Sequence, residues 1–363
     1  MNYKSLLYLL LIAIWGFIGC QNNSSTAAAY GSGKSTAPDA KTEFSRIQDF
    51  LKRYEEPSQF YSVTIALQSK VTGKNGTVLY INPDDLAAEN GQPIGKNIEV
   101  ELKELSNQRQ LLSANAPTVS NGQLLVSGGA YFINLTSEGQ QLKLKEGKTL
   151  SVEFPKLASE EMYLFYGQRD TLGQLNWIQS GQKFETLPPP RVASIEQRAE
   201  MPFSLIDSSR RRAQNKRPLT EEEKKAFEAR VVNASFHDKL YKIVKLNQLG
   251  WINCDIFYKT PNTTSLQYAF NAEDSIVSAY VYVVFKNMNS VMQGSYFSLD
   301  HSDMGSNFQN VPLGAKTQII AFSIKNGIIY AYNADLTIHA NERITIKLQE
   351  TNQEAVEKLL RSI

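Results

Sequence analysis

The sequence is poor in cysteine, in histidine and in net charge, and these shortages exclude some classes of function. Its 363 residues include two cysteines and three histidines, and 38 lysines and arginines nearly balance 36 acidic residues, for a formal net charge of +2. This balance lacks the clustered basic footprint of nucleic-acid-binding proteins. The two cysteines allow at most one disulfide bond. We therefore expect no nucleic-acid partner and no fold stabilised by several disulfides.

The apolar run near the N-terminus is too short for a membrane-spanning helix. Leu6 to Ile14 falls below the ~20 residues that a spanning helix needs and has the length of a signal-peptide core. Phe17-Ile18-Gly19-Cys20 follows, and the whole segment resembles a bacterial lipoprotein signal with this tetrapeptide as the lipobox. The resemblance implies that residues 1–19 are a signal peptide and that Cys20 is acylated. The alternative is an ordinary secretory signal that happens to contain a cysteine.

Residues 20–41 predict a lipidated, flexible tether, because they are rich in Asn, Ser, Ala, Gly and Thr and can bury little apolar area. Acylated Cys20 would anchor the chain in the lipid bilayer and leave Cys254 without a disulfide partner. Gln21 stands where the enteric lipoprotein pattern has an aspartate for inner-membrane retention, so the resemblance implies the outer membrane. Residues 21–30 lack the acidic cluster that resembles a Bacteroidetes surface-export signal, which favours the periplasmic face over the cell surface.

One motif in the tether resembles a nucleotide-binding site. Residues 31–36 match the end of a phosphate-binding loop, but Ala28 occupies the position of the first required glycine. The motif also needs a preceding strand and a following helix to direct backbone N–H groups at phosphate, and neither is predicted here. We expect no nucleotide or other cofactor.

The middle of the chain alternates apolar and polar residues with the period of β-strands. Residues 60–180 contain several such runs, each bounded by Gly, Asn, Pro or Asp, which predicts an antiparallel β-sandwich. Seventeen tyrosines and seventeen phenylalanines also favour β structure. Two runs on either side of Asp170 to Gly173 predict a hairpin that extends this domain or begins a small bridging unit.

Helical and linker segments flank this predicted sandwich. Apolar residues at helical spacing predict a short amphipathic helix over residues 42–56, with its apolar face packed on the next domain. Residues 182–218 contain Pro188 to Pro190 and a basic cluster at Arg210 to Arg212, which predict a solvated linker. Binding of anionic lipid or polysaccharide by these basic residues is the alternative. A capping-box signature predicts a helix over residues 219–232.

The C-terminal part returns to β patterns. Residues 235–350 predict a second β-sandwich, and Ile276 to Phe285, apolar on both faces, predicts its central buried strand. Asn326-Gly327 predicts a hairpin with a type I′ turn. Residues 351–363 predict a closing helix. The expected fold class is therefore mostly β, with two antiparallel β-sandwich domains and a few short helices.

Part of the first sandwich resembles a known module. Gly76 to Asn82, Ile98 to Leu105 and Ser127 to Ala130 are similar to the β-sandwich domain of ankyrins and netrin receptors, as it recurs in Bacteroidetes envelope proteins. The resemblance implies an interaction module. Some such domains cleave themselves at a His-Phe-Ser step, which this sequence lacks, since Ser235-Phe236-His237 has the reverse order. The run from Leu249 to Tyr258 resembles a stretch in uncharacterised Bacteroidetes outer-membrane lipoproteins, a resemblance that implies no activity.

Cys254 is the candidate nucleophile of a thiol hydrolase. Such a cysteine needs a histidine base within hydrogen-bonding reach. His237, His301 and His339 lie in no recognisable hydrolase signature, and Cys254 lies in an apolar run beside Asp255, whose charge would oppose thiolate formation. We expect a buried, structural thiol and no catalytic residues.

Two further clusters have candidate binding chemistry. Asp300-His301-Ser302-Asp303 could offer carboxylates and an imidazole to a metal ion, but the spacing matches neither zinc nor calcium templates, so we expect a polar turn and no metal. Trp251, Phe257 and Tyr258 could present an aromatic platform to a sugar or peptide, although aromatic side chains are more often part of a core.

These observations predict a non-enzymatic lipoprotein of the outer membrane whose β-sandwiches bind another envelope protein. The sequence leaves open two alternatives, a glycan-binding lipoprotein and a hydrolase that depends on Cys254.

Overall fold

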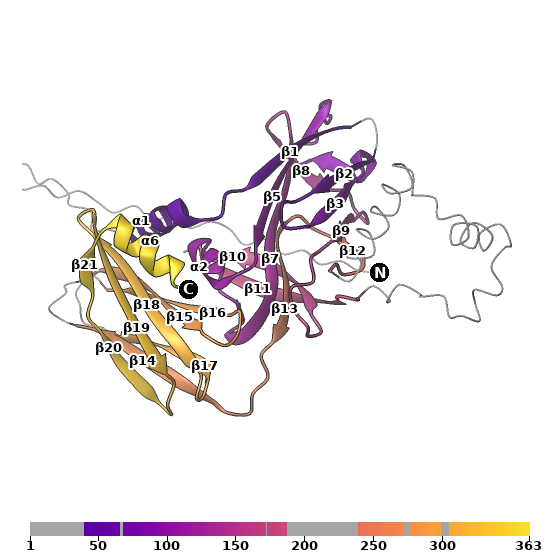
Figure 1. Cartoon of the computed structure of the whole chain (residues 1–363). Coiled ribbons are helices and arrows are strands. Elements are labelled where there is room, and N and C mark those ends of the chain that lie inside the picture. Colours follow the sequence, from indigo (N-terminus) through magenta and orange to yellow (C-terminus); the bar gives the residue numbers. More distant parts are fainter. Residues whose placement is uncertain (1–39, 66–67, 172, 187–238, 272–275, 299–304) are drawn as a thin grey trace, which may run out of the picture. The chain divides into compact units, whose positions relative to one another are not determined.

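Four β-sheets, paired into two sandwiches, account for most of the chain that the structure describes (Figure 1). The structure is a computed structural model, and it describes residues 40–65, 68–171, 173–186, 239–271, 276–298 and 305–363. The mostly-β fold with antiparallel sandwiches and a few short helices is confirmed. No helix within these ranges is long and apolar enough to cross a membrane.

The N-terminal sandwich packs a nine-stranded sheet on a four-stranded one. The larger sheet has the strand order β1 (Gln59–Thr64), β5 (Asn97–Leu105), β7 (Gln123–Ser137), β13 (Gly250–Phe257), β10 (Tyr163–Arg169), β11 (Leu175–Lys183), with β4 (Leu86–Ala88), β6 (Val119–Ser120) and β8 (Gln140–Leu144) beside this path. The smaller sheet has the order β12 (Val244–Leu246), β9 (Leu150–Glu153), β3 (Val78–Ile81), β2 (Ser69–Thr72). Alternate residues of both sheets form one core, as the period of two predicts.

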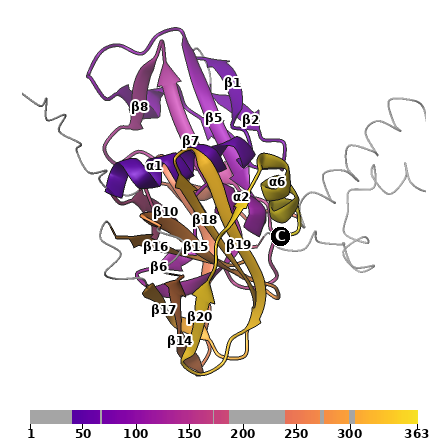
Figure 2. The same ribbon diagram turned by 90° about the vertical axis from the view of Figure 1, so that its left-hand side faces the viewer.

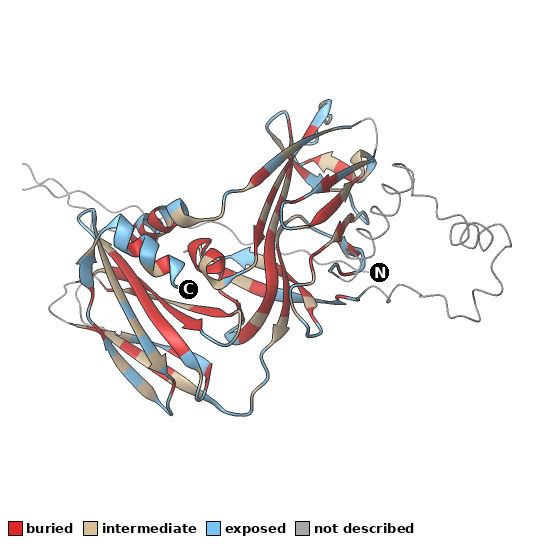
Figure 3. Ribbon diagram, viewed as in Figure 1, coloured by how far each residue is buried: buried red, intermediate tan, exposed pale blue. Residues whose placement is uncertain are grey.

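The C-terminal sandwich packs a five-stranded sheet on a three-stranded one. The order of the first is β16 (Val291–Phe297), β15 (Ser278–Phe285), β18 (Lys316–Lys325), β19 (Ile328–Thr337), β21 (Gln349–Thr351), and that of the second is β17 (Gly305–Pro312), β14 (Thr263–Phe270), β20 (Glu342–Ile346). Strand β15 lies between β16 and β18 and is buried along its whole length (Figure 3), as its two apolar faces predict. Asn326 and Gly327 have positive φ angles of 53° and 80° in the two-residue turn between β18 and β19, which confirms the predicted hairpin.

Two helices cover the outer face of the five-stranded sheet (Figure 2). They are α1 (Ala40–Leu51), continued by η1 (Lys52–Tyr54), and α6 (Gln353–Arg361), and both confirm the predicted helices. The expected partner of α1 was wrong, because its apolar face packs on β15 and β18 and not on the sandwich that follows it in sequence. Helical spacing identifies an apolar face but carries no information about which distant surface it covers. Within the described ranges, the remaining short helices are η2 (Pro83–Asp85) and α2 (Gln108–Ser113).

The predicted start of the second sandwich at residue 235 was also wrong. Strand β12 pairs with β9, and β13 lies between β7 and β10, so both strands complete the N-terminal sandwich. The first strand of the C-terminal sandwich is β14, which begins at Thr263. Strand periodicity predicts that a segment is a strand but does not predict its partners, which here precede it by 80 residues or more.

The first sandwich also extends past the predicted boundary at residue 180. The hairpin of β10 and β11 continues to Lys183, and Thr186 forms a bridge with Tyr241. Residues 1–39, with the predicted signal and most of the tether, lie outside the described ranges, as do the linker from residue 187 onward and the predicted helix over residues 219–232.

Hydrogen bonds join the two sandwiches at a continuous junction. Asn289 Nδ2 donates to the main-chain oxygens of Ser106 and Ser127, at 3.2 and 2.9 Å, and the Ser290 hydroxyl donates to the Leu125 oxygen at 2.6 Å. The side chain of Leu124 is part of the C-terminal core. The described sandwiches therefore belong to one compact unit.

Candidate functional site

Cys254 is buried in the core of the N-terminal sandwich, as expected. Its exposed fraction is 0%, and burial raises the pKa of its thiol well above the ordinary value, with Asp255 adding to the rise and the nearby Tyr241 hydroxyl opposing it. His339, the histidine within the described ranges, lies on the C-terminal sandwich, where its Nδ1 contacts Glu342 Oε2 at 2.8 Å. A protonated, buried thiol is a poor nucleophile. This environment argues against the hydrolase hypothesis.

A glycine bulge lies opposite Cys254, next to the buried carboxyl group of Asp255. The pairing register between β13 and β7 shifts at Gly128 and Gly129 of β7. A Cβ atom at Gly128 would lie 3.0 Å from the main-chain oxygen of Cys254. Next to the bulge, Asn253 Nδ2 donates to Asp255 Oδ2 at 2.6 Å. Burial raises the pKa of Asp255 well above its ordinary value, so the neutral acid is favoured. Bulges often mark functional sites, but the close packing here leaves this one structural.

The three aromatic residues of the predicted platform do not form one surface. Trp251 is half-buried, with its ring 5.2 Å from that of Phe132 and the Arg169 guanidinium 5.0 Å from its centroid. Phe257 packs edge-on to a buried phenylalanine. Tyr258 is 38% exposed, but it lies seven positions along the chain from Trp251, a distance of roughly 23 Å in an extended strand. These residues therefore cannot stack on one small ligand.

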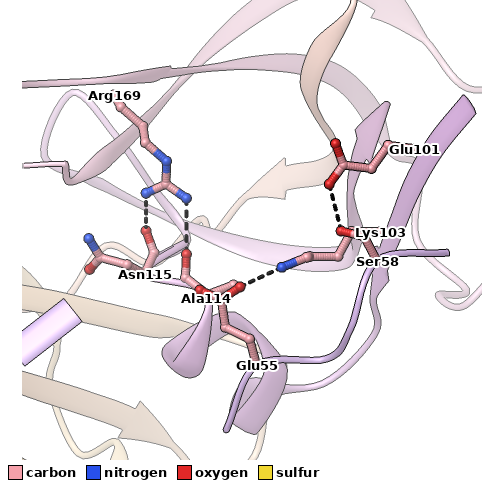
Figure 4. A network of polar contacts seen from close by, with 7 residues as sticks. All are labelled: Glu55, Ser58, Glu101, Lys103, Ala114, Asn115 and Arg169. Atoms are coloured by element: carbon pink, nitrogen blue, oxygen red, sulfur yellow. Dashed lines mark hydrogen bonds and ion pairs between the residues drawn. The ribbon is translucent and has the colours of Figure 1, made fainter. Parts of the chain in front are cut away.

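A polar network lies where η1 and α2 meet the larger sheet (Figure 4). Arg169 Nη1 donates to the Asn115 oxygen at 2.9 Å and Nη2 to the Ala114 oxygen at 3.0 Å, which caps the C-terminus of α2. Lys103 pairs with Glu55 in the same region, and the Ser58 hydroxyl donates to Glu101 at 2.8 Å. The network holds η1 and α2 on the larger sheet and has a structural role.

The remaining candidate is a groove that residues of both sandwiches line, which we call the inter-sandwich groove. Its volume is about 780 Å³. The N-terminal sandwich contributes residues 126–127, 157–160 and 256–259, and the C-terminal sandwich contributes residues 285, 287–289 and 312–316. The groove includes three large apolar side chains that are unusually exposed, Leu157 at 52%, Leu313 at 45% and Tyr258 at 38%.

Sequence reasoning missed this groove. The sequence pattern predicts Tyr258 only as part of an aromatic platform with Trp251, and it marks neither Leu157 nor Leu313. Both leucines lie outside the regular strands, where no periodicity marks them. The groove depends on the meeting of loops that are far apart in sequence, and no local pattern encodes that.

The described residues include no group of three or more His, Cys, Asp or Glu placed to hold a metal ion. The Asp300-His301-Ser302-Asp303 cluster, His237 and the acylation candidate Cys20 lie outside the described ranges, as does the basic cluster at Arg210 to Arg212.

The chain has little similarity to known proteins. No family model and no curated protein matches it. Among solved structures, a chain from a disulfide-locked mutant of intermedilysin with human CD59 is 8% identical over 84% of this chain and 70% of that chain, with a TM-score of 0.14. A likeness at this level carries no argument about fold or function.

Proposed function

We propose that this protein is a non-enzymatic lipoprotein, anchored in the outer membrane through acylated Cys20, and that its joined β-sandwiches bind another envelope protein. The binding part of the proposal is carried by one observation, the gathering of exposed Leu157, Tyr258 and Leu313 at the inter-sandwich groove. Contiguous exposed apolar side chains often mark interaction sites in soluble domains. The anchoring part is supported by the lipobox of the sequence.

Anchoring is tested by metabolic labelling with an alkyne analogue of palmitate in cells that express the full chain or its Cys20→Ala variant. We expect the wild-type protein to carry the label and to be recovered in the membrane fraction, and the variant to lose both properties. Equal labelling of the two proteins would contradict acylation at Cys20. Protease treatment of intact cells tests the orientation, since a chain on the periplasmic face is protected and a surface chain is digested.

Binding is tested by chemical crosslinking in living cells and affinity purification of the detergent-solubilised protein. We expect one stoichiometric protein partner. Recovery of envelope glycan in place of protein would favour the glycan-binding alternative, and recovery of neither would contradict the proposed function. The variant Cys254→Ala should still bind the partner. A hydrolase that depends on this thiol would instead lose its activity in the same variant.

A further inference from the structure

We propose that the inter-sandwich groove binds an extended, acidic segment of a protein partner, an inference that rests on the proposed function and deepens it. The argument uses the walls of the groove, its apolar side chains and its charges.

The walls of the groove are already fixed in position. Asn289, which lines the groove, donates from its side chain to the Ser127 oxygen at 2.9 Å, and the Ser127 N–H donates to the Asn289 oxygen at 3.0 Å. Ser127 lies on the opposite wall, so these reciprocal bonds hold the two walls together. A preformed site loses little conformational freedom when it binds. Its volume of about 780 Å³ is within the usual range of ligand sites, ~300–1,000 Å³.

The apolar side chains favour a polypeptide over a glycan. Leu157 and Tyr258 come from one wall and Leu313 from the other, and two of these three side chains are branched aliphatics. Sugars bind well to flat aromatic faces, whereas protruding leucines match the apolar side chains of a peptide. The exposed amide of Asn287 at the same groove can donate to and accept from the main chain of an extended segment.

The charges favour an acidic segment. Each wall contributes one lysine, Lys259 or Lys316, and neither forms an ion pair within the described part of the chain. Two lysines elsewhere on the same sandwiches, Lys183 and Lys286, are paired with Glu161 and Asp335. Glu160 is the acidic residue of the lining, so the lysines outnumber it. Carboxylates of a partner segment would complement this excess.

The test uses the full-length protein in cells, with a photo-crosslinking amino acid at Leu313. The same amino acid at Ile243 and at Ile328 provides controls, because these side chains are 49% and 40% exposed and do not line the groove. We expect crosslinks from position 313 to one segment of the partner that carries both acidic and apolar residues. A synthetic peptide with the sequence of that segment is then the probe for binding to the purified protein, measured by fluorescence anisotropy.

Charge reversal gives the decisive comparison. The double variant Lys259→Glu/Lys316→Glu should weaken peptide binding at least tenfold, while Lys143→Glu/Lys347→Glu, which makes the same charge change at exposed sites on the two sandwiches, should change it less than twofold. The double variant Leu157→Ser/Leu313→Ser should also weaken binding, and Ile243→Ser/Ile328→Ser should not. Circular dichroism of each variant checks that the fold is retained.

Each of the other outcomes overturns a different part of the proposal. A protein crosslinked only at the control positions would contradict binding at the groove and leave the proposed function intact. A crosslinked segment without acidic residues, or equal effects of the two lysine pairs on peptide binding, would contradict the acidic character of the ligand and also leave the proposed function intact. Glycan adducts at position 313 would show that the groove binds a glycan and not a peptide. Absence of any crosslinked partner, at the groove or elsewhere, would contradict the proposed function itself.

Discussion

The ring of Phe44 stacks on the ring of Tyr280, with the two centroids 4.8 Å apart and the ring planes inclined by 28°. Phe44 belongs to α1, the first described helix, and Tyr280 belongs to β15, a buried interior strand of the C-terminal sandwich. Next to this pair, Gln48 Nε2 donates to the Tyr280 hydroxyl at 2.6 Å. The beginning of the described chain therefore completes its last domain, and the two sandwiches are tied together by chain connectivity as well as by contact.

Truncation of Phe44 should destabilise the protein strongly. Phe44 is 2% exposed, and Phe44→Ala should lower the free energy of unfolding by about 3–5 kcal/mol, because it removes buried apolar area and leaves a cavity over β15. Asp49→Ala, on the exposed side of the same helix, is the matched control and should change it by less than ~0.5 kcal/mol. Urea unfolding of the full chain gives both values. Equal effects of the two variants would show that α1 does not pack as described.

Glu104 should prove essential to the turn that precedes β3. Its carboxylate is 2% exposed and accepts hydrogen bonds from the backbone N–H groups of Asn75 and Thr77, at 2.9 and 3.1 Å, and from Gln59 Nε2 at 2.8 Å. Glu104→Gln should cost about 1–3 kcal/mol of stability, because one amide N–H₂ would then face N–H donors. Glu89→Gln, at an exposed site, should cost almost nothing. Comparable unfolding midpoints for the two variants would contradict this role.

Asp255 should make stability fall as the pH rises. Burial raises its pKa well above 3.8 in the folded state, so the folded protein keeps a proton that the unfolded chain releases. Stability from this group is complete below about pH 3.8 and decreases above it, until the pH passes the folded pKa. Asp255→Asn should remove this decline. The free energy of unfolding of the variant, measured with urea, should therefore exceed that of the wild type by an amount that grows between pH 4 and pH 8. Asp49→Asn is the exposed control, and parallel curves for all three proteins would contradict the expectation.

The thiol of Cys254 should be inert in the folded protein. In a Cys20→Ser background Cys254 is the only cysteine, and its alkylation by iodoacetamide at pH 8 should be at least tenfold slower in the native protein than in urea, because the thiol is buried and protonated. An added surface cysteine, Lys347→Cys, provides the exposed reference in the same molecule. Mass spectrometry of the two peptides separates the rates. Native alkylation of Cys254 as fast as that of the surface thiol would reopen the hydrolase hypothesis.

The sequence predicts those parts of the structure that depend on neighbouring residues. The amphipathic spacing of Phe44, Ile47 and Phe50 predicts α1, and Asn326-Gly327 predicts the β18–β19 turn, because helical and turn conformations are set by residues within a few positions of one another. The burial of Cys254 follows in the same way from the apolar run around it.

Only the tertiary structure decides which of these elements meet. Strand β13 inserts between β7 and β10 instead of starting the second sandwich, and α1 crosses to the C-terminal sheet. Leu157, Tyr258 and Leu313 come together at one groove although they belong to three separate segments. Apolar periodicity fixes which face of an element is buried, but many partners satisfy the same pattern, and the choice among them depends on the packing of the whole chain.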